Sequence, residues 1–139
     1  MARIQVRLAP SADHIICRVI GLLHRQDFKR ILPKFKAYRE RMGISQVLLD
    51  VRHAINTSNA LDSYEFVHQD LAKFAISEPP RIAMLAKPRD RSHDFALMVL
   101  QNAGFKVERF ESVEKAEVWL GVGIANTNVD SVKEYQIRS

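Results

Sequence analysis

The chain opens with two short segments whose patterns are typical of β-strands. Ile4, Val6 and Leu8 alternate with polar residues, which is the period of a strand with one buried face. Residues 14–20 (HIICRVI) are rich in β-branched side chains, which favour a second strand. The segment 9–13 (APSAD) between them has turn composition, and so short a connection predicts an antiparallel pair.

The period then becomes that of an amphipathic helix over residues 25–42. Basic residues lie opposite an apolar stripe, which consists of Phe28, Ile31, Leu32, Phe35, Tyr38 and Met42. Gly43 is expected to end this helix in the left-handed conformation. Pro33 removes one backbone hydrogen bond, so we expect a kink or an interrupted first part rather than two helices.

The next unit is a short strand and a helix. Residues 47–49 form an apolar strand, and residues 52–60 are predicted to be a loop. Asp62 or Ser63 is expected to cap the following helix, which ends before the pair at 79–80 (PP). Its inward residues are predicted to be Tyr64, Val67, Leu71 and Phe74.

Two more strand–helix units follow. A buried strand is predicted over residues 82–86, and a helix capped by Ser92 extends to Asn102. A strand over residues 105–110 and a helix over residues 112–120 complete the pattern.

This order of elements predicts a single α/β domain over residues 1–121. Apolar strands that alternate with helices form a mostly parallel sheet, here of five strands flanked by four helices. The first strand is expected to be antiparallel. Residues 122–139 lose periodicity and are expected to be a tail that is partly ordered at best.

Composition narrows the class of protein. The 139 residues are 47% hydrophobic and 27% charged, which excludes collagen-like and wholly disordered chains. Cys17 is the one cysteine, so an internal disulfide framework and a cysteine-based zinc site are excluded, and the thiol is expected to be packed. No apolar run approaches the length of a membrane span, so we expect a cytoplasmic protein.

The net charge of +5 is concentrated in the first part of the chain. Residues 1–50 carry ten Lys/Arg and four Asp/Glu, and seven of the ten basic residues lie within 25–41. This concentration is typical of a solvated helix face. Nucleic acid is not expected as a partner, because the sequence has no basic strand interleaved with aromatic residues and no zinc finger.

Four motifs within residues 14–120 resemble those of the STAS domain, and specifically of SpoIIAA-like proteins related to bacterial anti-sigma-factor antagonists. The motifs are Ile31-Leu32-Pro33, Val47-Leu48-Leu49-Asp50-Val51-Arg52, Arg81-Ile82-Ala83 and Phe110-x-Ser112-x-x-x-Ala116-x-x-Trp119-Leu120. The resemblance implies a small α/β domain without known catalysis that regulates, or binds ligands and partners.

The resemblance also implies a phosphorylated serine at the start of the second helix, within an Asp-Ser-x-Gly-like turn. The matching region reads Asn56-Thr57-Ser58-Asn59, without Asp before Ser58 or Gly after it, and Asp62-Ser63 restores the dipeptide further along. Ser58 and Ser63 are therefore the two phosphorylation candidates. The alternative is that both serines only cap the helix or turn the chain.

Open α/β sheets bind ligands beyond the carboxyl ends of their parallel strands. Basic and hydroxyl side chains at helix N-termini suit a carboxylate, a phosphate or a lipid head group. The predicted anion-binding residues at these ends are Arg52, His53, Lys87, Arg89, Arg91 and Ser92. The alternative is that they are loop residues whose charges Asp90 and Asp94 neutralise.

The sequence contains no motif that marks catalysis. The five histidines have no metal-ligand spacing, and no nucleophile elbow or phosphate-binding glycine loop occurs. We therefore expect no metal, no cofactor and no enzymatic activity. Asp50 and His53 would be the best pair of titratable groups for an enzyme.

The predicted function is a non-catalytic regulatory module that binds a protein partner or a small ligand. The alternative is a carrier or sensor of an anionic amphiphile or lipid, held in an apolar pocket with a basic mouth. The apolar stripe of the helix over 25–42 could line such a pocket, form a homodimer face, or only belong to the core.

Overall fold

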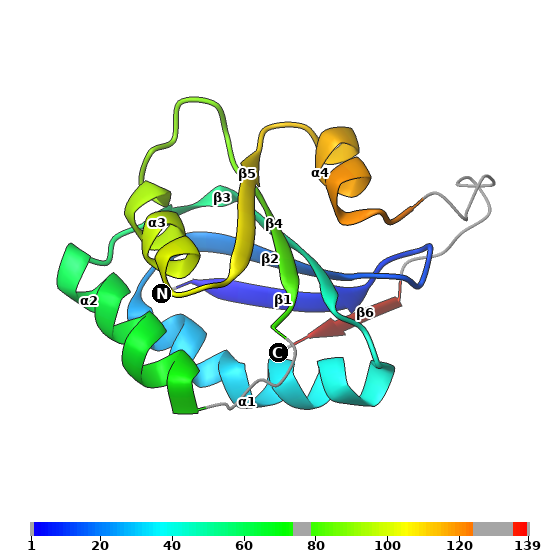
Figure 1. Ribbon diagram of the computed structural model, residues 1–139, viewed down its shortest axis with the longest axis horizontal. Coiled ribbons are helices and arrows are strands. Elements are labelled where there is room, and N and C mark those ends of the chain that lie inside the picture. Colours follow the sequence, from blue (N-terminus) through cyan, green and yellow to red (C-terminus); the bar gives the residue numbers. More distant parts are fainter. Residues whose placement is uncertain (1, 74–78, 124–134, 139) are drawn as a thin grey trace.

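The computed structural model describes residues 2–73, 79–123 and 135–138, and it contains one twisted sheet of six strands (Figure 1). The strand order is β5-β4-β3-β2-β1-β6. β2 to β5 are parallel, and β1 pairs antiparallel with β2 and with β6. The predicted five-stranded sheet with an antiparallel first strand is thus confirmed. The strands are β1 (Arg3–Leu8), β2 (Ile15–Leu23), β3 (Gln46–Asn56), β4 (Arg81–Leu85), β5 (Lys106–Phe110) and β6 (Tyr135–Arg138).

Helices flank both faces of this sheet, as predicted. The helices are α1 (Arg25–Met42), α2 (Ala60–Glu65), α3 (Asp94–Asn102) and α4 (Val113–Leu120). α2 continues without a break into a π-helical turn, η1 (Phe66–Asp70), and a 3₁₀ turn, η2 (Leu71–Lys73). Within the described residues, no helix has both the length and the apolar character that a membrane crossing requires.

Each face of the sheet has its own apolar core, because side chains alternate along a strand. On β2, Ile15, Cys17 and Val19 pack in the larger core under α1 and α3. Ile16 points the other way, into the smaller core that includes Ala116 and Leu120 of α4. Figure 1 shows α1, α2 and α3 on one side of the sheet and α4 on the other.

β2 and β3 are longer than the sequence pattern predicted. The predicted loop over residues 52–60 is wrong up to Asn56, because β3 continues through that residue. β2 likewise continues past Gly21, and the two strands remain paired to Leu23 and Asn56 after a register shift. Polar residues in this stretch indicated a loop, but here they lie on a strand whose outer face is exposed to solvent.

Helix ends follow the sequence prediction in part. α1 contains Pro33 without division into two helices, and Gly43 ends it with φ of 65°. Ser112 caps α4 as predicted, and its hydroxyl accepts a hydrogen bond from the Lys115 backbone. The predicted cap of α2 is wrong, because the Asn59 side chain accepts from the Asp62 backbone at 2.7 Å.

The start of α3 also differs from the prediction. The helix begins at Asp94, directly after His93. Ser92 does not cap it, because its hydroxyl accepts a hydrogen bond from the Asn56 backbone at 3.0 Å. The serine therefore ties the loop before α3 to the end of β3 instead of capping the start of α3.

The inward face of the second helix is also partly mispredicted. Tyr64 was expected to be buried, but 53% of its surface is exposed. The buried positions are Ser63, Val67 and Asp70, so the helix is rotated relative to the apolar pattern. The reason is the burial of Asp70 against a cation on α1, described below. Of the other predicted inward residues, Val67 is buried, Leu71 is half-buried and lines the cavity described below, and Phe74 lies outside the described residues.

The predicted tail lies mostly outside the described residues, at 124–134 and 139. The first described residues of the tail contact the domain. Val122 is buried, and the Gly123 backbone donates to the Asp13 carboxylate at 2.9 Å. The described part ends with β6, which pairs with β1 at the edge of the sheet. The sequence pattern did not predict this strand, and the predicted domain boundary at residue 121 stays a prediction.

Burial of Cys17 in the larger core generates a prediction about its reactivity. Burial, with the nearby charge of Asp50, raises the pKa of the thiol to about 12. At pH 8 the thiolate fraction is about 1,000-fold lower than for an ordinary cysteine of pKa about 9. We expect iodoacetamide to leave the native protein unmodified by mass spectrometry and to add a single adduct in guanidinium chloride. Alkylation of the native protein at a comparable rate would contradict this packing.

Candidate functional site

An apolar cavity of about 170 Å³ lies between the sheet and the helices on the α1 face. Phe28, Ile31, Leu32 and Phe35 line it from α1. Further apolar walls come from β3, β4, the segment from α2 to η2, and α3. Most of the predicted apolar stripe therefore lines this cavity, whereas Tyr38 belongs to the core and Met42 is exposed at 40%.

Polar residues line the cavity at the start of α1, the end of β3 and the start of α2, and two basic residues line it further along α1. They are His24, Arg25, Lys36, Arg39, Asn56, Ser58, Asp62 and Ser63, with His93 directly before α3. Both phosphorylation candidates therefore border the same cavity. Ser58 is half-buried and its backbone donates to the Asn56 side chain, whereas Ser63 is only 6% exposed within α2. Phosphorylation of either serine stays a prediction.

Arg25 joins α1 to the π-helical turn on the other side of the cavity. Its Nε and Nη2 donate to the two carboxylate oxygens of Asp70 at 2.8 and 3.1 Å, and its Nη1 donates to Glu65 at 2.6 Å. The Asp70 side chain is 3% exposed. The Arg25 hydrogen bonds hold the pKa of Asp70 below its usual value of 3.8. This ion-pair cluster fixes the α2–η1 segment against α1.

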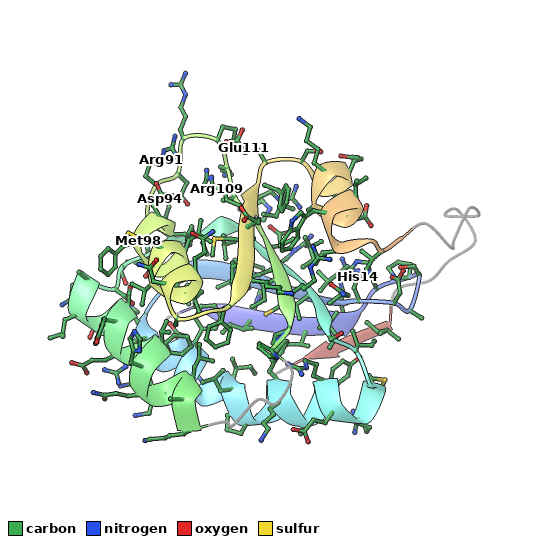
Figure 2. All side chains as sticks on the ribbon, in the orientation of Figure 1. His14, Arg91, Asp94, Met98, Arg109 and Glu111 are labelled. Carbon is green, nitrogen blue, oxygen red and sulfur yellow. The ribbon has the colours of Figure 1, made fainter. Side chains whose placement is uncertain are left out.

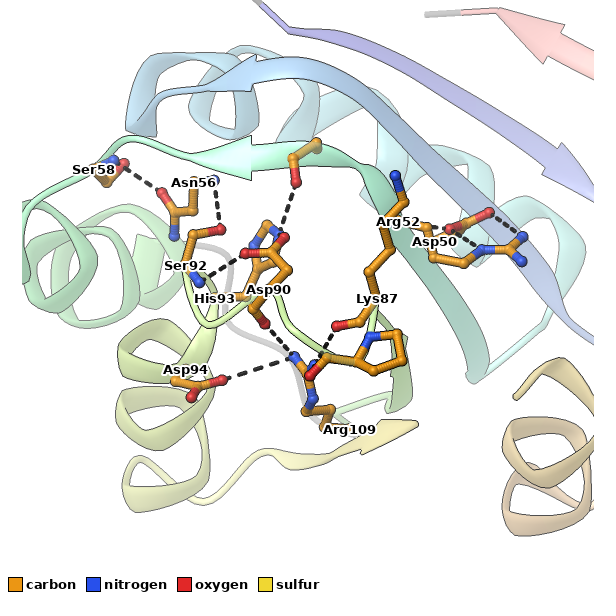
Figure 3. A network of polar contacts seen from close by, with 12 residues as sticks. Asp50, Arg52, Asn56, Ser58, Lys87, Asp90, Ser92, His93, Asp94 and Arg109 are labelled. Carbon is orange, nitrogen blue, oxygen red and sulfur yellow. Dashed lines mark hydrogen bonds and ion pairs between the residues drawn. The ribbon is translucent and has the colours of Figure 1, made fainter. Parts of the chain in front are cut away.

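A second polar network lies in the loop between β4 and α3, at the carboxyl end of the sheet (Figure 3). The buried His93 ring places Nε2 at 3.1 Å from the Ala54 carbonyl oxygen and at 3.3 Å from an Asp90 carboxylate oxygen. The other Asp90 oxygen accepts from the Ser92 backbone at 2.9 Å. Together with the Ser92–Asn56 hydrogen bond, these contacts tie the loop to the end of β3.

Arg109 of β5 holds the same loop from its other side. Its guanidinium donates to the Lys87 carbonyl at 2.6 Å and to the Asp90 carbonyl at 3.0 Å. Asp94 and Glu111 lie at 3.8 and 3.9 Å from it (Figures 2 and 3). Sequence analysis did not single out Arg109. The sequence indicated this residue only by its place near the end of a predicted strand, at the carboxyl edge of the sheet.

The structure brings only part of the predicted anion-binding set together. Lys87, Arg89, Arg91 and Ser92 share the β4–α3 loop, and Arg91 pairs with Asp94 at 3.6 Å. Arg52 instead forms a two-pronged ion pair with Asp50 (Figure 3). His53 is exposed on β3. Anion binding by this loop stays a prediction. Arg52 is not part of the loop, because it is paired with Asp50.

The geometry gives Asp50 and His53 no shared catalytic arrangement. Burial alone would raise the pKa of Asp50, but the hydrogen bonds from Arg52 and the charges of Arg52 and Arg18 outweigh it and lower the pKa. A carboxylate held ionised between two arginines is a weak base. Across the described ranges, no three His, Cys, Asp or Glu side chains lie close enough to hold a metal ion.

The Arg25–Asp70 cluster predicts a pH-dependent difference in stability. Because the pKa of Asp70 is lowered on folding, its contribution is present above pH 3.8 and is lost as the pH falls through the folded-state pKa. We expect D70N to lower the thermal midpoint by several degrees at pH 7, and the gap to the wild type to close below about pH 3.8. The control is E40Q, whose exposed pair with Lys36 contributes little. A gap that stays constant with pH would contradict the ionised pair.

No protein-family model and no curated protein matches this sequence. Among solved structures, the chain is similar to an uncharacterised DUF3478-family protein with a SpoIIAA-like fold from Shewanella loihica PV-4. The TM-score is 0.57 at 16% identity, over 86% of this chain and 93% of that one. It is also similar to the anti-sigma-factor antagonist SpoIIAA in its unphosphorylated form, with TM-score 0.51 at 13% identity, over 86% and 97%. The chain therefore has the SpoIIAA-like α/β fold that its motifs predicted.

Proposed function

We propose that this protein is a non-catalytic regulatory module of the STAS type that binds a protein partner through the outer surface of α2 and α3. The fold supports the class, because SpoIIAA is named as an anti-sigma-factor antagonist. The observation that carries the proposal is a group of large apolar side chains exposed on these two helices. They are Leu61 at 63%, Tyr64 at 53%, Phe95 at 40% and Met98 at 46%.

These four side chains belong to one surface. Leu61 and Tyr64 are three residues apart on α2, and Phe95 and Met98 are three apart on α3, so each pair lies on one helix face. α2 and α3 contact each other, and Figure 2 shows Met98 on the side of α3 away from the sheet. A group of exposed apolar side chains on one surface often marks a site of protein interaction, whereas single scattered ones do not. We name this the α2–α3 surface.

The α2–α3 surface also adjoins the loop that precedes α2, where Ser58 lies. A phosphate at Ser58 would place two negative charges beside a predominantly apolar binding surface. Such a charge opposes burial of that surface by a partner, which is a physical means of switching binding. A cytoplasmic location and phosphorylation belong to this proposal.

Small-ligand binding in the cavity is the second candidate function. An apolar cavity of this kind is favourable for an apolar group, and a dry cavity of about 150 Å³ holds a molecule of benzene size. Ligand pockets for larger molecules usually exceed about 300 Å³. A lipid chain would require α1 to separate from the sheet, so the carrier alternative is less well supported than partner binding.

The partner proposal predicts that polar substitutions on the α2–α3 surface abolish capture of a specific protein. We expect L61S/F95S to weaken binding about tenfold or more in pull-downs quantified by mass spectrometry, because exposed anchors contribute most of an interface's free energy. This double variant should melt near the wild-type temperature, since surface substitutions change stability little.

The matched control is V118S, which removes an apolar side chain that is 74% exposed on α4. This variant should retain every partner that the wild type captures. Sedimentation of the purified chain distinguishes a second copy from a different protein. Equal capture by all three proteins would refute the α2–α3 surface as the binding site.

The cavity candidate predicts that a benzene-sized ligand raises the thermal midpoint of the wild type. A96L places a larger side chain at a position that lines the cavity and should reduce this stabilisation. Native mass spectrometry of the purified protein would reveal a ligand that already occupies the cavity. The absence of both a co-purified mass and a ligand-dependent shift would exclude this second function.

A further inference from the structure

The described residues cover the face of the sheet opposite α1 only in part. α4 packs on β4, β3 and β5. Away from α4, Leu22 of β2 and Ile55 of β3 are paired in register and expose 54% and 50% of their surfaces. Among the described residues, this face is therefore exposed at Leu22 and Ile55, at the ends of β2 and β3.

The charged residues of β1, β2 and β3 all lie on this face. The three strands contain four arginines and a single carboxylate, namely Arg3, Arg7, Arg18, Arg52 and Asp50. Strand register places them together, because Arg18 is paired with Asp50 on β3 and with Gln5 on β1, between Arg3 and Arg7. A solvated protein face usually mixes both signs of charge, whereas these three strands carry an excess of three positive charges.

Asp50 orients two of these arginines. Its Oδ1 accepts from the backbone and the Nε of Arg52 at 3.1 and 3.0 Å, and its Oδ2 accepts from the Arg52 Nη2 at 2.9 Å. The Nε of Arg18 lies 3.4 Å from the same Oδ2. The carboxylate is 3% exposed, while the Arg18 and Arg52 side chains are exposed at 38% and 34%.

One guanidinium is sufficient to neutralise a buried carboxylate, so the second one is in excess. A guanidinium has five N–H donors, and Asp50 accepts hydrogen bonds from two side-chain nitrogens of Arg52. The Nε of Arg18 is only an ion-pair neighbour at 3.4 Å and is buried without a hydrogen-bond partner among the described residues. The remaining donors belong to side chains that are partly exposed. Two arginines that are oriented in this way match the oxygens of a phosphate group.

We propose that Arg18 and Arg52, oriented by Asp50, form a binding site for a phosphate group on this open face of the sheet. The excess charge of the face favours a doubly charged phosphate over a singly charged carboxylate. Single-stranded nucleic acid is disfavoured as the source, because β1, β2 and β3 contain no Phe, Tyr or Trp on which bases could stack. Arg18 and Arg52 are strand residues and belong neither to the β4–α3 loop nor to the α2–α3 surface.

The test is a calorimetric titration of the full chain with inorganic phosphate in chloride buffer at constant ionic strength. We expect saturable binding to the wild type and a loss of about tenfold or more in affinity for R18Q, which leaves the Arg52–Asp50 pair in place. R18K keeps the charge without the planar fork and should bind with intermediate affinity. K34Q removes the same charge from the exposed side of α1 and should bind like the wild type.

A second arm identifies the source of the phosphate group. Co-sedimentation with phosphatidylcholine vesicles, with and without phosphatidic acid, measures binding to a lipid headgroup. Loss of either phosphate or phosphatidic acid binding in R18Q, with retention in K34Q, supports the site and assigns a soluble or a headgroup source. Absence of saturable binding in both arms, or equal weakening in R18Q and K34Q, overturns the proposal. Thermal melts of each variant show whether the fold is intact.

Discussion

Parallel strands require cover on both faces, and the described helices meet this requirement unequally. α1, α2 and α3 share one face, so the residues beneath them form a continuous apolar core from Ile4 to Val107. Of the described helices, α4 covers part of the other face, and Ala9 and Val122 add to the core beneath it. The cavity under α1 and the arginines on the open face both follow from this unequal division.

Polar contacts then fix the elements whose apolar burial is incomplete. Arg25 binds the π-helical turn through Asp70 and Glu65, and Arg109 binds the backbone of the β4–α3 loop. Asp27 has a similar role at the start of α1, where it accepts from the His24 backbone at 2.9 Å and from the Ala2 backbone at 3.3 Å. In each case a charged group holds two segments that are distant in sequence. These partly or fully buried charges fix the positions of α1, the π-helical turn and the β4–α3 loop.

The sequence predicted the fold well where the local signal and the tertiary environment agree. Gly43 and Ser112 end and begin helices through contacts within a few residues, so their roles were readable from the pattern. The extension of β3 was not, because Arg52 and His53 are polar residues on a strand with one open face. The rotation of α2 was also hidden, because Asp70 is buried by a partner 45 residues away. Among the predicted site residues, only those of one loop were brought together, since Arg52 turns to Asp50.

The strand order leaves β5 at one edge of the sheet and β6 at the other. An unpaired edge invites edge-to-edge pairing with other chains, and proteins commonly oppose this with charged side chains. β5 is short and reads Lys106-Val107-Glu108-Arg109-Phe110, with Lys106 and Glu108 exposed. Its own composition therefore guards that edge against aggregation, whereas β1 is shielded because another strand of the same chain occupies its outer hydrogen-bonding groups.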